Sequence, residues 1–346
     1  MDKHFPVARR TTINSTNELT EAMCRKVVGQ PKAIAGIVPY IQMHQASLAP
    51  EGRPAGVFLL LGPTGTGKTR TVEALAEQLH GSPKQMLKVD CGEFQMEHEV
   101  AKLIGAPPGY LGHRETQPMF TQAKLNAVSS ERSDLSIVLF DEIEKAAHSM
   151  TRLLLGILDK AALRLGDNTT VNFERTLIFL TSNLGARAMI RSIRPDFGFE
   201  SIAGVPHKDQ GSKLESIGVA AVRRRFTPEF VNRIDQVITY RPLDADAMAK
   251  ILDHLLADFQ RLVNSRLGVR AFRLELTGRA RKFLLKEGAS EEFGARELKR
   301  TLHRFLVHPL AAEISASRIA PGSLVSADAK NGRVVLRVFD DKERAA

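Results

Sequence analysis

The sequence contains no long hydrophobic run, which excludes an integral membrane protein. Its longest apolar stretches, at residues 57–61, 137–140 and 176–180, have the length of a β-strand. A membrane-spanning helix needs roughly 18 or more apolar residues. The first residues, MDKHFPVARRTT, also lack the apolar stretch and the small-residue cleavage site of a secretory signal. We therefore expect a soluble, cytoplasmic protein.

Cysteine is also scarce, and its scarcity excludes a disulfide framework. The 346 residues include two cysteines, Cys24 and Cys91, and neither belongs to a CxxC or CxxH motif that would suggest a zinc site. We expect both to be buried thiols.

Acidic residues are fewer than basic ones. The chain has 39 Asp and Glu against 49 Lys and Arg, which gives a formal net charge of +10. Such a balance allows a nucleic acid, an acidic protein or an anionic cofactor as partner. A solvated basic surface explains it equally well, so charge alone does not choose the partner.

The hydrophobic pattern predicts a large α/β domain built on a parallel sheet. After a polar, flexible lead-in over residues 1–18, helical periodicity begins near Leu19, breaks at Gly29-Gln30-Pro31 and resumes from Ile34. Short β-rich runs then alternate with helical stretches, at residues 57–61, 86–90, 136–140, 176–181 and 236–240. Because these runs are apolar throughout rather than alternating, they fit a sheet covered by helices on both faces.

A boundary follows at Arg241-Pro242-Leu243, so we assign residues 19–241 to the large domain and 242–346 to a smaller one. Residues 244–266 have strong helical periodicity. Two short β-like runs, at 272–276 and 333–339, bracket further helices over about 277–318. The second domain is therefore predicted to be mostly helical with short strands.

A glycine-rich loop predicts a phosphate-binding site. Residues 62–69 read GPTGTGKT, after the strand-like VFLLL and before the helical TRTVEALAEQLH. The glycines let the backbone curl so that its N–H groups point into one concavity, Lys68 adds a positive charge toward the β- and γ-phosphates, and Thr69 offers a hydroxyl to Mg²⁺. A Gly-rich surface turn is the alternative, which the flanking strand and helix disfavour. The predicted nucleotide-binding residues are Gly62, Pro63, Thr64, Gly65, Thr66, Gly67, Lys68, Thr69 and Arg70.

Two further predicted strands end in polar residues. One runs into Asp141-Glu142 and another into Thr181-Ser182-Asn183. Since ligands bind outside the carboxyl ends of parallel strands, Asp141 is placed to hold the Mg²⁺ shell and Glu142 to polarise the attacking water. Asn183 is placed to bond the same water or a γ-phosphate oxygen. Taken alone each signal is weaker, because Asp-Glu often starts a solvated helix and Asn often caps or turns the chain.

Several motifs together resemble one known family. They are VVGQPKAI, GPTGTGKT, IGAPPGYLGH, VLFDEIEKA, LTSNLGA, FTPEFVNRID and FGARELKR. This combination resembles the second ATPase module of the Clp unfoldases, which belong to the AAA+ superfamily of P-loop NTPases, and the likeness runs from about Leu19 to Phe339. It implies an AAA+ fold with a C-terminal lid domain. Because no adaptor domain and no first ATPase module precede these motifs, we expect a stand-alone, single-ring form.

The resemblance also implies roles for residues outside the phosphate loop. The family closes its nucleotide sites between neighbouring subunits of a six-membered ring, and Arg233 matches the arginine that each subunit donates to its neighbour. Arg296 matches the sensor arginine of the small domain, and Asn183 matches the sensor of the large domain. Val27 and Val28 lie where the family holds the adenine base. For any single arginine a surface charge is the alternative, and the motif context selects these two.

Two segments resemble loops with which the family handles protein. Tyr110 and Leu111 match the pore loop that grips an extended polypeptide, although a tyrosine buried beneath a tight turn is the alternative. Phe197-Gly198-Phe199 is similar to the tripeptide by which some members dock onto a ClpP-type peptidase, although such a loop can also tuck its phenylalanines into its own domain. Residues 160–170, where the family has a second pore loop, lack the usual acidic and glycine pattern, so we assign them no role.

These observations predict an ATP-dependent protein unfoldase or remodelling chaperone. It would hydrolyse ATP with Mg²⁺, form a homo-hexamer and thread polypeptide clients through its pore, with a ClpP-type peptidase as a further candidate partner. A nucleic-acid-directed ATPase is the alternative, which the charge of +10 supports, although no helix-turn-helix or aromatic-studded basic groove is evident. A non-hydrolysing switch would need a degraded catalytic set, whereas the sequence retains Lys68, Asp141, Glu142, Asn183, Arg233 and Arg296.

Overall fold

The computed structural model describes residues 16–105, 118–193, 208–290 and 293–339. The chain divides between Arg241 and Pro242 into two compact units. Among the described residues, no helix is both long enough and apolar enough to cross a membrane.

The first unit is built on a five-stranded sheet with the order β2-β3-β6-β1-β7. Its strands are β1 (Gly56–Leu61), β2 (Leu87–Asp90), β3 (Ser136–Asp141), β6 (Thr176–Ser182) and β7 (Gln236–Thr239). All neighbouring strands in this sheet run parallel. The β-rich runs of the sequence are therefore all strands of one sheet, and the predicted parallel arrangement is confirmed.

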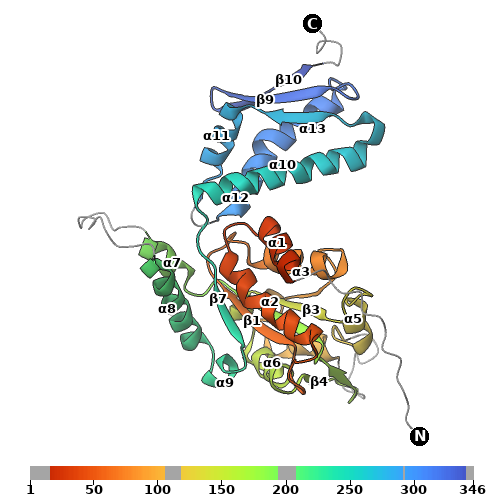
Figure 1. The fold of residues 1–346 in the computed structure, drawn as a ribbon, viewed down its shortest axis with the longest axis vertical. Coiled ribbons are helices and arrows are strands. Elements are labelled where there is room, and N and C mark those ends of the chain that lie inside the picture. Colours follow the sequence, from red (N-terminus) through yellow and green to blue (C-terminus); the bar gives the residue numbers. More distant parts are fainter. Residues whose placement is uncertain (1–15, 106–117, 194–207, 291–292, 340–346) are drawn as a thin grey trace, which may run out of the picture. The chain divides into compact units, whose positions relative to one another are not determined.

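Helices cover both faces of this sheet (Figure 1). They are α1 (Thr16–Lys26), α2 (Pro31–Gln45), α3 (Lys68–His80), α4 (Ala101–Ile104), α5 (Gln122–Ala127), α6 (His148–Lys160), α7 (Ala186–Ile193), α8 (Lys208–Arg225) and α9 (Pro228–Val231), with 3₁₀ turns η1 (Cys91–Glu93), η2 (Glu97–Val100) and η3 (Ile143–Lys145). Within β1, Leu59 and Leu61 belong to a core shared with α5, α6, α8 and α9, whereas Phe58 and Leu60 belong to a core shared with α1, α2 and α3. Successive side chains of a strand point to opposite faces, so a strand buried on both faces is apolar throughout.

The two N-terminal helices follow the predicted break. Gly29 turns the chain between them with a φ of 77°, which glycine adopts without steric cost, and Pro31 opens α2. Cys91 is buried as expected, but Cys24 is exposed, so the prediction for Cys24 was wrong. The buried face of α1 is set by Leu19 and Met23, four residues apart, and Cys24 lies off that face.

A short antiparallel hairpin forms in the region to which the sequence assigned no role. Its strands are β4 (Ala162–Arg164) and β5 (Thr170–Asn172). Leu163 and Val171 are paired across it and are both buried, whereas Arg164 and Thr170 are exposed. Strands of three residues are too short to give a periodic signal, which explains why the sequence did not predict them.

The second unit combines helices with a three-stranded sheet of order β10-β9-β8. Its elements are α10 (Ala245–Leu267), η4 (Gly268–Arg270), β8 (Arg273–Leu276), α11 (Gly278–Glu287), α12 (Ala295–Leu302), the π-helical η5 (His303–Val307), α13 (His308–Ser315), β9 (Leu324–Lys330) and β10 (Arg333–Phe339). The outer strands β8 and β10 match the predicted runs. The central strand β9, LVSADAK, was missed because Ser, Ala and Asp have low β-propensity.

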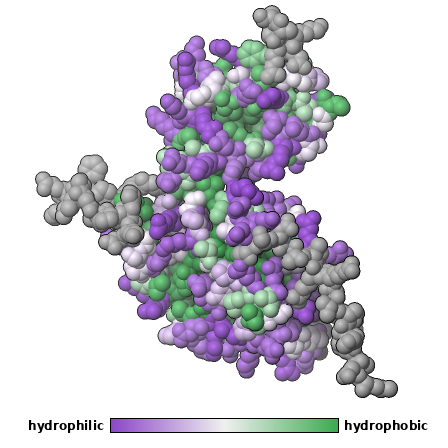
Figure 2. Space-filling view, viewed as in Figure 1, coloured by the Kyte–Doolittle hydropathy of each residue, from purple (hydrophilic) through white to green (hydrophobic). Residues whose placement is uncertain are grey.

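The surface contrasts with these interiors. The face visible in Figure 2 is mainly hydrophilic, and its apolar side chains gather in separate patches. Within the described ranges the apolar residues form two buried cores in the first unit and one in the second. Each unit therefore has its own hydrophobic core, as an independently compact domain requires.

Candidate nucleotide-binding site

The predicted polar residues meet at the carboxyl edge of the parallel sheet. The strands β3, β6 and β1 are adjacent, and Leu61 is paired with Ser182 at their ends. Asp141 ends β3, and Asn183 directly follows β6. The sheet therefore brings the phosphate loop, the Asp-Glu pair and Asn183 to one edge, where parallel sheets bind their ligands.

The phosphate loop joins β1 to α3, as predicted. Gly62, Gly65 and Gly67 have φ values of 146°, 74° and 104°, all in the region that favours glycine. Position 62 also has no room for a side chain, because a Cβ there would lie 2.8 Å from the carbonyl oxygen of Tyr240. Helix α3 begins at Lys68, so the loop ends at a helix N-terminus, where backbone N–H groups and the helix dipole favour an anion.

Lys68 ties this loop to the neighbouring strand. Its Nζ donates to the carbonyl oxygens of Gly62 at 2.7 Å and Pro63 at 2.9 Å, and to Asn183 Oδ1 at 2.9 Å. The side chain is buried. A buried ammonium group at the mouth of the loop supplies the positive charge that a phosphate chain needs.

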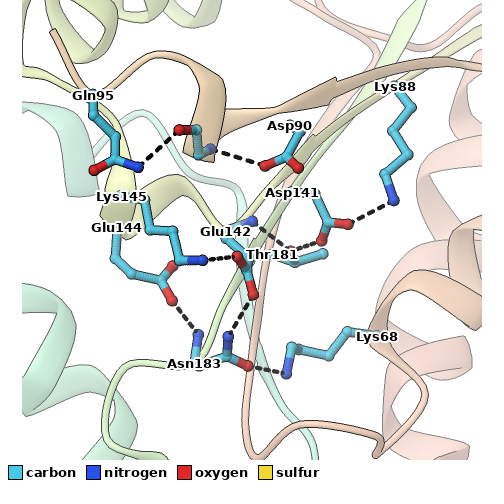
Figure 3. Close-up of polar contacts among 11 residues, drawn as sticks. Lys68, Lys88, Asp90, Gln95, Asp141, Glu142, Glu144, Lys145, Thr181 and Asn183 are labelled. Carbon is cyan, nitrogen blue, oxygen red and sulfur yellow. Dashed lines mark hydrogen bonds and ion pairs between the residues drawn. The ribbon is translucent and has the colours of Figure 1, made fainter. Parts of the chain in front are cut away.

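Glu142 is held from three sides (Figure 3). Asn183 Nδ2 donates to its Oε1 at 3.3 Å, Lys145 forms an ion pair with its carboxylate, and its backbone N–H donates to Thr181 Oγ1 at 3.0 Å. Its φ of 57° lies in the left-handed region, which is uncommon for a residue other than glycine. Such strain is concentrated at functional sites and persists where the surroundings fix it.

Asp141 stays ionised despite its burial. Burial opposes the charge, but hydrogen bonds from Lys88 and Thr181 and the positive charges of Lys88 and Lys68 outweigh it, so the pKa of Asp141 lies below its ordinary value. The Lys88 ammonium lies 2.7 Å from Asp141 Oδ2, and the Thr181 hydroxyl donates to Oδ1. The edge of the sheet thus presents an ionised carboxylate beside the phosphate loop.

Four residues of this cluster were not predicted from the sequence. Lys88, Lys145 and Thr181 contact the Asp-Glu pair as described above, and Glu144 Oε1 accepts a hydrogen bond of 2.9 Å from the backbone N–H of Asn183. Lys145 and Glu144 lie inside the quoted motif VLFDEIEKA, and the three-residue spacing from Glu142 to Lys145 is a signal that could have identified that pair. Lys88 and Thr181 become neighbours of Asp141 only through strand pairing.

Arg233 lies at the opposite edge of the sheet. It precedes β7, whose first residue Gln236 is paired with Phe58 near the start of β1, so the length of β1 separates it from the phosphate loop of its own chain. Its Nη1 lies 2.8 Å from Asp159 Oδ1 of α6. The structure therefore does not bring Arg233 together with the other predicted site residues.

The remaining predicted residues fall into three groups. Val27 is buried and Val28 half-buried, just after α1, whose Lys26 lies 2.5 Å from Glu77 of α3; both valines thus lie near the helix that begins at the phosphate loop. Arg296 belongs to α12 of the second unit. Tyr110, Leu111 and Phe197-Gly198-Phe199 lie outside the described residues.

The chain matches two described families along most of its length. Residues 53–237 match the family described as "AAA domain (Cdc48 subfamily)". Residues 243–327 match the family described as "C-terminal, D2-small domain, of ClpB protein". The two matches correspond to the large parallel-sheet unit and to the smaller unit.

Curated relatives and solved structures agree with these families. The chain is 37% identical over 327 residues to the chaperone protein ClpB of Aquifex aeolicus, which covers 94% of this chain and 31% of that protein. It is also 37% identical over 305 residues to ClpB of Meiothermus ruber, covering 88% of this chain and 33% of that protein. The chain thus spans about a third of the length of these relatives.

The structural likeness covers the same extent. A complex of S. cerevisiae Hsp104 with casein has a TM-score of 0.79 at 27% identity, covering 94% of this chain and 52% of that one. A closed state of Hsp104 with ATPγS and FITC-casein has a TM-score of 0.78 at 29% identity, covering 93% and 51%. The overall fold is therefore shared with these proteins, as the sequence resemblance implied.

Proposed function

Because the chain belongs to the Clp-type AAA+ ATPases, we propose that it is an ATP-dependent protein unfoldase or remodelling chaperone that works as a homo-hexameric ring. The observation that carries this proposal is the meeting of Lys68, Glu142 and Asn183 at one edge of the sheet. Relatives named as chaperones, and structures in which Hsp104 is recorded with casein, favour a polypeptide over a nucleic acid as the client.

The proposed reaction is the attack of water on the γ-phosphorus of ATP, which breaks the bridge between the β- and γ-phosphates. Glu142 is the proposed base that accepts the proton of this water, and Asn183, bonded to it, orients the same water. Lys68 lies close enough to exchange its loop carbonyls for phosphate oxygens. The left-handed backbone conformation of Glu142 sets the direction in which its side chain leaves the main chain.

Mg²⁺ is the proposed metal, held by Thr69 and Asp141 together with phosphate oxygens. A hydroxyl and an ionised carboxylate are hard oxygen donors of the kind that Mg²⁺ takes, and its sites are commonly completed by substrate phosphates and water. Within the described parts of the chain no three His, Cys, Asp or Glu side chains come together as a metal site. When bound there, such an ion would neutralise the charge that develops on the phosphates.

The proposed ring explains why Arg233 lies far from its own phosphate loop. In a ring with head-to-tail contacts, each subunit presents one edge of its sheet to the nucleotide held by the next. Arg233 is then the arginine that stabilises the transition state in the neighbouring site. Arg296 is the proposed nucleotide sensor of the second unit, and Val27 and Val28 are the proposed contacts of the adenine ring.

The proposed grip on the client is Tyr110 with Leu111. An aromatic ring contacts an extended polypeptide without reading its sequence. Phe197-Gly198-Phe199 is a proposed docking tripeptide for a ClpP-type peptidase, and a binding assay of the chain with such a peptidase, repeated with Phe199→Ser, tests that part separately.

The central experiment is Glu142→Gln. This variant is expected to bind ATP and assemble like the wild type but to release phosphate at least about 100-fold more slowly, because the base is lost. Glu131→Gln, at an exposed glutamate, is the matched control and should turn over normally. Normal turnover of Glu142→Gln would refute its assignment as the base.

A second measurement separates protein clients from nucleic acid. Unstructured casein is expected to stimulate wild-type turnover, and Tyr110→Ala is expected to abolish that stimulation. Duplex DNA should neither stimulate turnover nor bind with a steep dependence on salt. Stimulation by DNA but not by casein would replace the unfoldase with the nucleic-acid-directed alternative.

A further inference from the structure

Arg225 bonds to the backbone that follows Glu142. Its Nε and Nη2 donate to the carbonyl oxygen of Glu144 at 3.1 and 2.9 Å, and Nη2 also donates to that of Ala146 at 3.2 Å. Arg225 is the last of three consecutive arginines at the end of α8. Within the described residues the side chains of Arg223 and Arg224 make no hydrogen bond or ion pair, so the contact belongs to Arg225 alone among the three.

The segment that Arg225 holds is a single tight turn that begins at Glu142. Lys145 N–H donates to the carbonyl oxygen of Glu142 at 2.9 Å, and Ala146 N–H donates to that of Ile143 at 3.2 Å. The Glu144 carboxylate accepts from the backbone of Asn183 at 2.9 Å. One turn of backbone therefore connects Arg225 with the two side chains proposed to handle the attacking water.

Arg225 is also one end of a rigid segment that reaches Arg233. Phe226 is stacked on Phe230 with 5.0 Å between ring centroids, and both rings are buried. Thr227 caps α9 by accepting from Phe230 N–H, and Arg233 N–H donates to the carbonyl oxygen of Phe230 at 3.2 Å. Capping and aromatic packing of this kind stabilise a short segment in one conformation.

This segment and α6 share a hydrophobic core but leave a pocket between them. A cavity of about 160 Å³ lies between them, lined by His148, Thr151 and Leu155 of α6 and by Phe226 and Phe230. The hydrogen bonds of Arg225, an exposed side chain beside this pocket, join the segment to the turn after Glu142.

From these contacts we propose that Arg225 is a positioning residue that couples Arg233 to Glu142 within one subunit. The inference rests on the proposed function, in which Arg233 serves the neighbour's nucleotide and Glu142 the subunit's own. Engagement of Arg233 by the neighbouring phosphate moves the segment from Arg225 to Arg233, and Arg225 transmits the shift to the turn that orients Glu142. Each subunit thereby links the two nucleotide sites in which it takes part.

The test is a double-mutant cycle on ATP turnover by the assembled protein. Arg225→Ala is expected to lower the turnover number about 10-fold, because Glu142 then no longer receives the shift that starts at Arg233, and to leave KM for ATP within about twofold. The variant Arg225→Ala/Arg233→Ala is expected to be no slower than Arg233→Ala alone, since a coupling residue has nothing to transmit once Arg233 is gone. Effects that multiply in the double variant would overturn the coupling.

Controls separate coupling from loss of fold. Arg224→Ala, at the exposed neighbour on the same helix, should match the wild type in turnover and in thermal unfolding. Arg225→Lys keeps a cationic donor and should recover most of the turnover that Arg225→Gln loses. If Lys and Gln both equal the wild type, Arg225 has no positioning role.

Failure of the proposed function and failure of the coupling would give different results in these variants. If Arg233→Ala turns over normally, the donation of Arg233 to a neighbour is wrong, whatever Arg225 does. If Arg233→Ala is slow and Arg225→Ala multiplies that defect, the donation stands and the coupling alone is wrong.

Discussion

The two edges of the parallel sheet are built in opposite ways. At the carboxyl edge a lysine is bonded to each of three acceptors: Lys88 to Asp141, Lys145 to Glu142 and Lys68 to Asn183. At the amino edge Arg233 pairs with Asp159, and the two side chains are 39% and 34% exposed. An ion pair so open to water contributes about 0–1 kcal/mol.

This difference teaches which groups the fold fixes and which it leaves free to move. Lys88 and Lys145 are themselves 45% and 50% exposed, so the carboxyl edge differs in its connections rather than in its burial. A network of linked groups has one preferred arrangement, because each group limits the next. A lone, half-exposed pair can be broken at small cost. The groups of the carboxyl edge are thus suited to keeping their arrangement relative to one another, and the amino edge is suited to exchanging one partner for another.

The largest effect is expected from Arg233→Ala, which tests whether the amino edge takes part in the reaction. Turnover should fall about 10³-fold or more, as it does when other arginine fingers are removed, while ATP binding is retained. Phosphate release and ATP titration measure the two quantities. Arg175→Ala is the matched control, because Arg175 precedes β6 at the same edge and its side chain is 72% exposed. Equal loss in both variants would mean that the edge, rather than Arg233, matters.

Gly62→Ala tests the rigidity of the carboxyl edge. A Cβ at this position would meet the carbonyl oxygen of Tyr240 at 2.8 Å, and the φ of 146° is itself strained for alanine. We expect the free energy of unfolding to fall by about 2 kcal/mol, measured by chemical denaturation. Gly52→Ala is the control, since Gly52 also has a positive φ of 71° but no atom within 4 Å of the added Cβ. An equal loss at both glycines would assign the effect to backbone strain alone.

Lys88→Met tests the charge network through its pH dependence. The pKa of Asp141 lies below its ordinary 3.8 in the folded protein. The stabilisation by Lys88 is therefore fully present above pH 3.8 and is lost as the pH falls through the lower pKa of the folded state. The variant should therefore be less stable by about 1 kcal/mol at neutral pH, and the difference should shrink below pH 3.8. Denaturation curves at a series of pH values measure it, and Lys84→Met, at an exposed lysine, should show no such trend.

The smallest effect is expected from Asp159→Asn. Loss of a half-exposed ion pair should change the free energy of unfolding by less than about 1 kcal/mol, and turnover should remain within about threefold of the wild type, because Arg233 is proposed to act away from Asp159. A large loss of turnover would instead show that Asp159 holds Arg233 in its active position. That result would remove the contrast between the two edges.

The sequence predicted the sheet better than its surroundings. Buried parallel strands are apolar throughout, so residues 57–61 and 136–140 can be recognised as strands from their own sequence, without knowledge of the neighbouring strand. The strand β9 (Leu324–Lys330) and the β4–β5 hairpin do not, because they are short or rich in small polar residues. Cys24 was misplaced because exposure depends on which face of α1 is covered, and that face is defined only by packing.

The site shows the same division. Its motif residues follow strands and a loop whose chemistry can be read directly, and the fold brings Lys68, Glu142 and Asn183 together. Lys88 and Thr181 were missed because they reach Asp141 through the pairing of β2 and β6 with β3, and strand order is not written in local sequence. Arg225 and Glu144, which it contacts in the turn after Glu142, are 81 positions apart in the chain. No local sequence pattern predicts a contact at that separation.

The left-handed backbone at Glu142 limits how this position can be altered. Branched side chains such as Val, Ile and Thr are excluded sterically from a φ of 57°, so they would disturb the backbone as well as remove the carboxylate. Asn and Gly tolerate that conformation, and Gln keeps the shape of the original side chain. Anyone wishing to build a trapped, nucleotide-loaded form of this protein therefore has a short list of usable replacements, and an inactive variant from outside that list would say little about chemistry.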